Sequence, residues 1–226
     1  MDLKEIVGLE AAKFASSGMI VGLGTGSTSN FFIRELARRT REEGLDIVCL
    51  PSSHASARLG HESGLRVLDA ELVERVDLYV DGADEVDSAK RLLKGRGAAM
   101  VGEKILAEAC DKFVVIIDES KRVDQLGSRF PVPVEVMPGG WMVARRRVQS
   151  LGGQVVLRTG SGKDGPVVTD RGNFVLDATF PAGADLNALD GALDSIPGVV
   201  GHGLFLRYAG KTTVLVGSSG GVRILP

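Results

Sequence analysis

Acidic and basic side chains gather around a glycine-rich segment in the middle of the chain. Asp81 and Asp84 follow a short apolar run, Lys94 stands among glycines, and Glu103 lies where the first turn of a helix is expected. Carboxylates and an amine held around flexible backbone are the groups that a proton-transfer site uses. A solvated acidic turn followed by a loop has the same composition, because charged loops usually lie at the surface. The rest of the chain has to decide between these two interpretations.

A second candidate site is the glycine turn GTGST at residues 24–28, between an expected strand and an expected helix. The N-terminus of a helix offers backbone N–H groups and partial positive charge, and hydroxyls add donors, so this arrangement can bind an anion. The pattern G-x-G-x-x-G is incomplete, and the next strand ends in Pro51, Ser52 and Ser53 instead of an acid. Both features count against NAD and against the similar loop of methyltransferases, and the absence of GK[ST] excludes a P-loop. A small phosphate monoester remains, with Ser52 and Ser53 as further donors, and a plain capped turn is the alternative.

Composition and charge narrow the class of protein. The chain has 226 residues, 44% of them hydrophobic, and a net charge of −2, which gives no electrostatic case for nucleic acid or an anionic membrane. Apolar runs stay well short of the roughly 18 residues that a membrane span needs, and the charged start MDLKEIVG is unlike a signal peptide. Cys49 and Cys110 lie in apolar runs far apart, and the three histidines lack metal-ligand spacing, so buried thiols and no zinc site are expected. We therefore predict a cytoplasmic protein with no nucleic-acid or membrane partner.

The elements that must position these residues alternate between strands and helices. Apolar runs predict strands at residues 19–23, 46–50, 76–80 and 112–118, and helical spacing predicts helices at 3–16, from 29 onward, at 55–63 and at 103–110. Such alternation implies a parallel sheet with helices on both faces, and ligands bind beyond the carboxyl ends of its strands. The glycine turn, the two serines, the aspartates and Lys121 each follow a strand directly. We expect them to converge on one edge of the sheet.

From residue 131 the order of elements changes. Strands are expected at 132–136, 154–158, 173–178 and 199–206, and helices at 140–151 and 186–195, which is the β-α-β-β-α-β order of a ferredoxin-like motif. A last strand at 211–217 can return to the first sheet. We therefore predict an α/β protein with a Rossmann-like parallel-sheet domain, residues 1–130 and 207–226, and an inserted α+β ferredoxin-like domain, residues 131–206.

Several separate motifs, in this order, make the chain resemble the type A ribose-5-phosphate isomerases. They are GTGST at 24–28, DGADE at 81–85, KGRGAA at 94–99, EK at 103–104, DESK at 118–121 and PVEV at 133–136, and the resemblance covers nearly the whole chain. It implies reversible conversion of D-ribose 5-phosphate to D-ribulose 5-phosphate in the pentose phosphate pathway, with no metal or organic cofactor, by a homodimer or homotetramer. The chain departs from the usual family pattern in two places: Arg96 replaces a glycine, and Val101 with Gly102 replaces a Thr-Arg-like pair.

The resemblance also implies site residues, position by position. Glu103 takes the place of the proton acceptor, and Lys4 matches a lysine that helps to hold phosphate. The residues implied to bind substrate are Thr25, Gly26, Ser27, Thr28, Asp81, Gly82, Ala83, Asp84, Lys94, Gly95, Arg96, Gly97 and Lys121.

The isomerisation moves a carbon-bound proton between C2 and C1 through an enediol, and hypothetical roles follow from that chemistry. Glu103 shuttles the proton, Asp81 opens the furanose ring as an acid–base, and Asp84 holds sugar hydroxyls. Lys94 stabilises the developing oxyanion, while Lys121 with Ser27 and Thr28 anchors the phosphate. Three alternatives share these groups: an aminosugar-phosphate deaminase, a coenzyme A transferase with a glutamate nucleophile, and a sugar-phosphate sensor without turnover.

Overall fold

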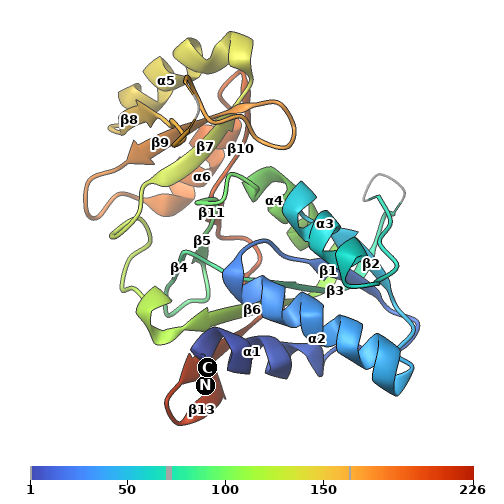
Figure 1. Ribbon diagram of the computed structural model, residues 1–226. Coiled ribbons are helices and arrows are strands. Elements are labelled where there is room, and N and C mark those ends of the chain that lie inside the picture. Colours follow the sequence, from blue (N-terminus) through green and yellow to red (C-terminus); the bar gives the residue numbers. More distant parts are fainter. Residues whose placement is uncertain (1, 70–72, 163) are drawn as a thin grey trace.

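The longest apolar runs of the chain form the middle of a six-stranded sheet (Figure 1). In the computed structural model, which describes residues 2–69, 73–162 and 164–226, the strand order is β13-β12-β6-β3-β1-β2. Neighbours from β12 to β2 run parallel, and β13 is antiparallel at one edge. The strands are β1 (Ile20–Leu23), β2 (Val48–Pro51), β3 (Val76–Asp81), β6 (Cys110–Asp118), β12 (Thr212–Ser218) and β13 (Gly221–Ile224).

Side chains alternate along β3 and β6 between two apolar cores, because successive residues of a strand point to opposite faces. On one face, Leu78 and Val114 are buried in a core with α1 (Leu3–Ala12) and α2 (Ser27–Glu43). On the other face, Tyr79 and Phe113 stack with ring centroids 4.8 Å apart, in a core with α4 (Met100–Ala109). Helices thus cover both faces of the sheet, and the predicted Rossmann-like fold class is confirmed. The helix α3 (His54–Glu62) follows β2 and packs against it.

The second sheet has four antiparallel strands in the order β10-β7-β9-β8 and lies at one end of the molecule (Figure 1). It encloses a third core with the helices α5 (Trp141–Ser150) and α6 (Leu186–Asp194). The chain order β7-α5-β8-β9-α6-β10 matches the predicted ferredoxin-like motif. The strands are β7 (Val132–Val136), β8 (Gln154–Leu157), β9 (Phe174–Thr179) and β10 (Val199–His202).

A small three-stranded sheet, absent from the sequence prediction, lies between the two larger ones. It contains β4 (Glu85–Val86), β5 (Leu92–Leu93) and β11 (Leu204–Phe205) in the order β11-β5-β4. The prediction of one continuous strand at 199–206 is therefore wrong, because β10 and β11 belong to different sheets. The break falls at Gly203, whose N–H donates to Pro133 O (2.8 Å) and whose carbonyl accepts from Lys94 N (2.9 Å). A side chain here would overlap the backbone of Lys94, so only glycine allows this close approach.

Candidate active site

A cavity of about 270 Å³ lies at the carboxyl ends of the parallel strands. Its wall is formed by the turn after β1, the turn after β3, the loop at 94–97, the first turn of α4 and the short helix η2 (Glu119–Lys121) that follows β6. The predicted site residues that line it are Thr25, Gly26, Ser27, Thr28, Gly82, Ala83, Asp84, Lys94, Gly95, Arg96, Gly97, Glu103 and Lys121, and Lys4 and Ser29 join them. The predicted convergence on one edge of the sheet is thus observed for these residues.

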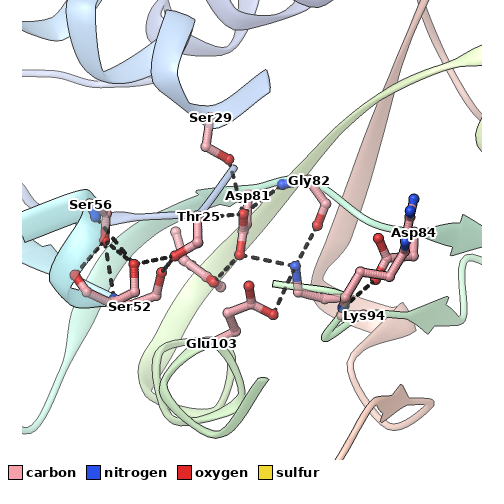
Figure 2. A network of polar contacts seen from close by, with 12 residues as sticks. Thr25, Ser29, Ser52, Ser56, Asp81, Gly82, Asp84, Lys94 and Glu103 are labelled. Atoms are coloured by element: carbon pink, nitrogen blue, oxygen red, sulfur yellow. Dashed lines mark hydrogen bonds and ion pairs between the residues drawn. The ribbon is translucent and has the colours of Figure 1, made fainter. Parts of the chain in front are cut away.

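Asp81 lies behind this wall, with its side chain fully buried (Figure 2). Its Oδ1 accepts hydrogen bonds from Thr25 N (2.9 Å), Gly82 N (2.7 Å) and Ser29 Oγ (3.0 Å). Its Oδ2 accepts from the Tyr79 hydroxyl (2.5 Å) and from Lys94 Nζ (3.0 Å). Five donors therefore occupy both oxygens, an arrangement that fixes the neighbours of Asp81 and leaves it poorly placed to exchange protons with a substrate.

The sequence prediction missed Tyr79 and Ser29, two of the donors to Asp81. A signal for Tyr79 was present, since a tyrosine two residues before Asp81 on the same strand shares its face of the sheet. Ser29 had a weaker signal, as one of several hydroxyls at the start of a helix.

Lys94 connects Asp81 to Glu103. Its Nζ lies 3.0 Å from Asp81 Oδ2 and 3.3 Å from Glu103 Oε2, and it also donates to Gly82 O at 2.5 Å. Burial raises the pKa of Glu103 to about 8, against the lowering effect of Lys94 and with a further increase from Asp81 and Asp84. Burial alone would lower the pKa of Lys94, but the charges of Asp81 and Glu103 raise it above its usual value. Glu103 can therefore take up and release a proton close to neutral pH.

The glycine turn and the start of α2 have the geometry that the predicted anion cradle requires. Gly26 caps α2 with φ +115°, a conformation that favours glycine, and leaves Ser27 and Thr28 in the first turn at the cavity. Lys4 donates from Nζ to Ser27 Oγ at 3.0 Å, which adds a cation to the N-terminus of a 17-residue helix.

The prediction that Ser52 and Ser53 are donors to the anion is not supported by their positions. Their hydroxyls each lie 2.7 Å from Thr25 Oγ1, so they brace the glycine turn from behind. Both serines line a different and larger cavity, of about 660 Å³, which α3 and the loop around Arg171 enclose.

The loop at 94–97 tolerates its unusual arginine. The left-handed residues in this loop are Gly95 (φ +103°) and Ala98 (φ +57°), so Arg96 needs no strained conformation. Its guanidinium stacks on Phe130, 4.2 Å from the ring centroid, and Lys121 Nζ lies 5.7 Å from the same ring. Two cations thus share one aromatic support at the rim of the cavity.

Within residues 2–69, 73–162 and 164–226, no group of three or more His, Cys, Asp or Glu side chains is placed to hold a metal ion. In the same described part of the chain, no helix is long and apolar enough to cross a membrane. Cys49 and Cys110 are both free and buried, in agreement with the predicted structural thiols.

The fold and the cavity together define an α/β enzyme with a buried carboxylate–lysine pair in a cavity that also contains the N-terminus of a helix. The model of the family described as ribose 5-phosphate isomerase A (phosphoriboisomerase A) matches residues 48–221. Ribose-5-phosphate isomerase A of Methanothermobacter thermautotrophicus is 48% identical over 226 residues, which cover 100% of this chain and 98% of that protein. The chain belongs to the ribose-5-phosphate isomerase A family.

Solved structures agree with this assignment. Ribose 5-phosphate isomerase A from Methanocaldococcus jannaschii has a TM-score of 0.93 and 41% identity, covering 99% of this chain and 98% of that one. A D-ribose-5-phosphate isomerase in complex with phospho-erythronic acid has a TM-score of 0.94 and 40% identity, covering 100% of this chain and 99% of that one.

Proposed function

We propose that the chain is an aldose–ketose isomerase that interconverts D-ribose 5-phosphate and D-ribulose 5-phosphate, in the non-oxidative pentose phosphate pathway. Membership of the family supports the substrate. The single observation that carries the chemistry is the contact of 3.3 Å between Lys94 Nζ and Glu103 Oε2, on the wall of a cavity that also contains the anion cradle.

In the proposed mechanism Glu103 moves one proton between two carbon atoms of the open-chain sugar. Its carboxylate takes the proton from C2 of the aldose, which leaves an enediolate with negative charge on the oxygen of C1. The hydroxyl proton on the oxygen of C2 then passes to the oxygen of C1, which moves the charge to the oxygen of C2. The same carboxyl group then returns the proton to C1 and forms the ketose. A pKa near 8 suits both half-reactions, because the group must accept and donate at similar pH.

Lys94 supplies the positive charge for the enediolate. It is already desolvated, and three fixed acceptors hold it, so it needs little reorganisation when negative charge develops. Asp81 holds this lysine. We predicted Asp81 as the acid–base that opens the furanose ring and Asp84 as the residue that holds sugar hydroxyls. Because Asp81 is fully buried and Asp84 lines the cavity, we now assign the acid–base role in ring opening to Asp84 as well.

The phosphate binds at the other end of the cavity. The N–H groups of the first turn of α2, with Ser27 and Thr28, face it, and Lys4 and Lys121 contribute cations. Binding the phosphate away from the reacting carbons helps to fix their position relative to Glu103.

The substitution Glu103→Gln tests the proposal. It keeps the shape of the side chain and removes the base, so we expect kcat for ribose 5-phosphate to fall by about three orders of magnitude or more. Binding of phospho-erythronic acid, measured by calorimetry, should stay within about tenfold of wild type, because Lys94 and the phosphate cradle remain. Turnover close to wild type in this variant would contradict the role of Glu103.

We further propose that the enzyme works in the cytoplasm as a homodimer or homotetramer. Free, buried thiols support a reducing compartment. Exposed apolar side chains on adjoining segments of the second sheet support self-association: Met137 is 56% exposed, Met142 64% and Val200 43%. Light scattering should therefore give a multiple of the chain mass of 23.8 kDa, and a monomer at micromolar concentration would contradict the assembly.

A further inference from the structure

Arg158 links the second sheet to the loop that borders the candidate active site. It follows β8, and its side chain is 14% exposed. Its Nε and Nη2 donate to the two carboxylate oxygens of Asp177 on β9, at 2.8 and 2.5 Å. Its Nη1 donates to the backbone carbonyls of Gly95 (3.0 Å) and Arg96 (3.1 Å). Because the two-pronged pair fixes the plane of the guanidinium, Asp177 aims the remaining N–H groups at the loop.

The loop that Arg158 contacts is held in an unfavourable conformation. Gly95 has φ +103°, and Ala98 has φ +57°, a left-handed region that is unfavourable for a residue with a Cβ. Such a conformation persists where the surroundings hold it in place. The Arg158 contacts are part of that support, together with the bond from Ala98 N to Gly95 O (3.1 Å).

Each carbonyl that Arg158 engages also fixes the direction of an N–H group, because the C=O and N–H of one trans peptide plane point in opposite directions. With Gly95 O bound to Arg158, the N–H of Arg96 points the other way and donates to Asp84 Oδ2 at 3.0 Å. With Arg96 O bound to Arg158, the N–H of Gly97 points away from Arg158, and Gly97 itself lines the cavity. Within the described residues, this N–H has no protein acceptor.

We propose that Arg158 is a positioning residue for the isomerisation, oriented by Asp177, which keeps the Gly97 N–H and the Asp84 carboxylate directed at the substrate. The inference rests on the proposed function. Lys94 does not depend on this contact, because its own N–H is anchored to Gly203 O (2.9 Å) and its Nζ to Asp81. Loss of Arg158 therefore misdirects two groups near the reacting carbons and leaves the phosphate cradle and the Lys94–Glu103 pair in place.

The test uses Arg158→Ala, Arg158→Lys, Asp177→Asn and the double variant, with Arg75→Ala as the matched control. Arg75 also pairs with an aspartate through Nε (2.9 Å) and Nη2 (2.5 Å), both of which donate to Asp111 Oδ2, and it lies outside the cavity wall. The measurements are kcat and KM for ribose 5-phosphate, the melting temperature, and hydrogen exchange of a peptide that contains residues 94–99.

Arg158→Ala should lower kcat by about 10- to 100-fold, the range for a displaced donor or a misaligned substrate, with KM changed by less than about threefold. Exchange in residues 94–99 should become faster, while Arg75→Ala leaves kcat and exchange unchanged. Lysine should restore kcat in part, because one ammonium cannot reach Asp177 and both carbonyls together. Since Asp177 acts through Arg158, Asp177→Asn should have little further effect in the Arg158→Ala background.

Three results would overturn the positioning role: kcat within about twofold of wild type, unchanged exchange in residues 94–99, or additive effects of the two substitutions. A loss of activity that follows a lower melting temperature, with faster exchange throughout the chain, would also overturn it. Hydrogen exchange of residues 94–99 can be measured without turnover. The positioning role of Arg158 can therefore fail independently of the proposed isomerase function. A wild-type protein that does not isomerise ribose 5-phosphate would instead overturn the proposed function.

Discussion

Three buried charged side chains determine what the cavity can do chemically. Lys94 lies between Asp81 and Glu103, at 3.0 and 3.3 Å from their carboxylate oxygens. One buried cation balances one carboxylate, and a second ionised carboxylate at the same place is costly because burial removes its hydration. This imbalance, together with burial, accounts for the raised pKa of Glu103. Burial and the neighbouring charges therefore favour a proton on Glu103, the residue that we propose as the base.

The pH dependence of activity follows from this pKa. Below about pH 8 most of Glu103 carries a proton and cannot accept another, so kcat/KM should rise about tenfold per pH unit and level off above about pH 8. Asp81 raises the pKa of Glu103, and Asp81→Asn removes that charge, so the rising limb should move to lower pH by about one unit. The amide oxygen can still accept the three bonds that Oδ1 receives.

The control for this prediction is Glu62→Gln, an exposed carboxylate on α3, which should leave the profile unchanged. Stopped-flow rates with ribose 5-phosphate between pH 5.5 and 9.5 give the position of the rising limb of kcat/KM. If the pH profile of Asp81→Asn has its rising limb at the same pH as wild type, the charge of Asp81 does not influence the pKa of Glu103. A bell shape that loses one limb in this variant would instead support our first hypothesis of Asp81 as an acid–base.

At the scale of elements, the first turn of α4 decides where Glu103 points. Glycine has a low helix propensity, so Gly102 by itself would loosen the start of this helix. The structure gives it another function, since a Cβ at Gly102 would overlap the carbonyl oxygen of Ser52 and lie 2.8 Å from Arg171 Nη1. Glycine thus lets α4 approach the end of β2, and the next residue, Glu103, reaches the cavity.

We therefore expect Gly102→Ala to destabilise the protein, although alanine favours helices by about 1 kcal/mol over glycine. A backbone carbonyl cannot move aside without moving β2, and overpacking of this kind costs about 1–3 kcal/mol. Displacement of α4 should also lower kcat by about tenfold. Urea unfolding measures the first effect and steady-state kinetics the second.

Gly191→Ala in α6 is the matched control, because no atom lies within 4 Å of the added Cβ. It should stabilise the protein by about 0.5–1 kcal/mol. If Gly102→Ala stabilised the protein by a similar amount, the close approach of α4 to Ser52 would not contribute to the free energy of unfolding.

How far the sequence predicts these elements depends on whether the signal is local. The strands β3 and β6 and the carboxyl-end positions of Asp84 and Lys121 follow from short patterns, and the structure agrees with them. The glycine turn before α2 was also predicted, although the helix begins at Ser27 and not at residue 29. The break at Gly203 does not follow from a short pattern, because it depends on Lys94, more than one hundred positions earlier in the chain. The burial of Asp81 and the contact of Arg158 with the loop were missed for the same reason, since long-range packing decides where a side chain points.

At the scale of the whole molecule, several contacts join the four-stranded sheet to the six-stranded sheet and its loops. We propose that residues 131–206 form an inserted domain, but several contacts tie it to the rest. β11 pairs with β5, Gly203 O binds Lys94 N, and Arg158 binds the loop at 94–97. Glu85 holds the segment that leads into β7. Its buried carboxylate accepts hydrogen bonds from the backbone N–H groups of Gly127 (2.6 Å), Arg129 (2.8 Å) and Phe130 (2.9 Å). Since these contacts connect the segment 131–206 to the rest of the chain, we expect the wild-type chain to unfold as one cooperative unit.

Glu85→Gln tests this coupling. The amide keeps one oxygen and turns an NH₂ group towards an N–H donor, so the loss of charge-assisted bonds at a buried site should cost about 2–3 kcal/mol. Trp141, the one tryptophan of the chain, packs against the core of the second sheet, and its fluorescence reports on that sheet alone. In wild type its urea transition should coincide with that of far-UV ellipticity. In Glu85→Gln the fluorescence transition should come at lower urea, because the second sheet loses its attachment first, whereas Glu62→Gln should leave both transitions together. Coincident transitions in Glu85→Gln would show that strand pairing and the loop contacts couple the sheets without the help of this carboxylate.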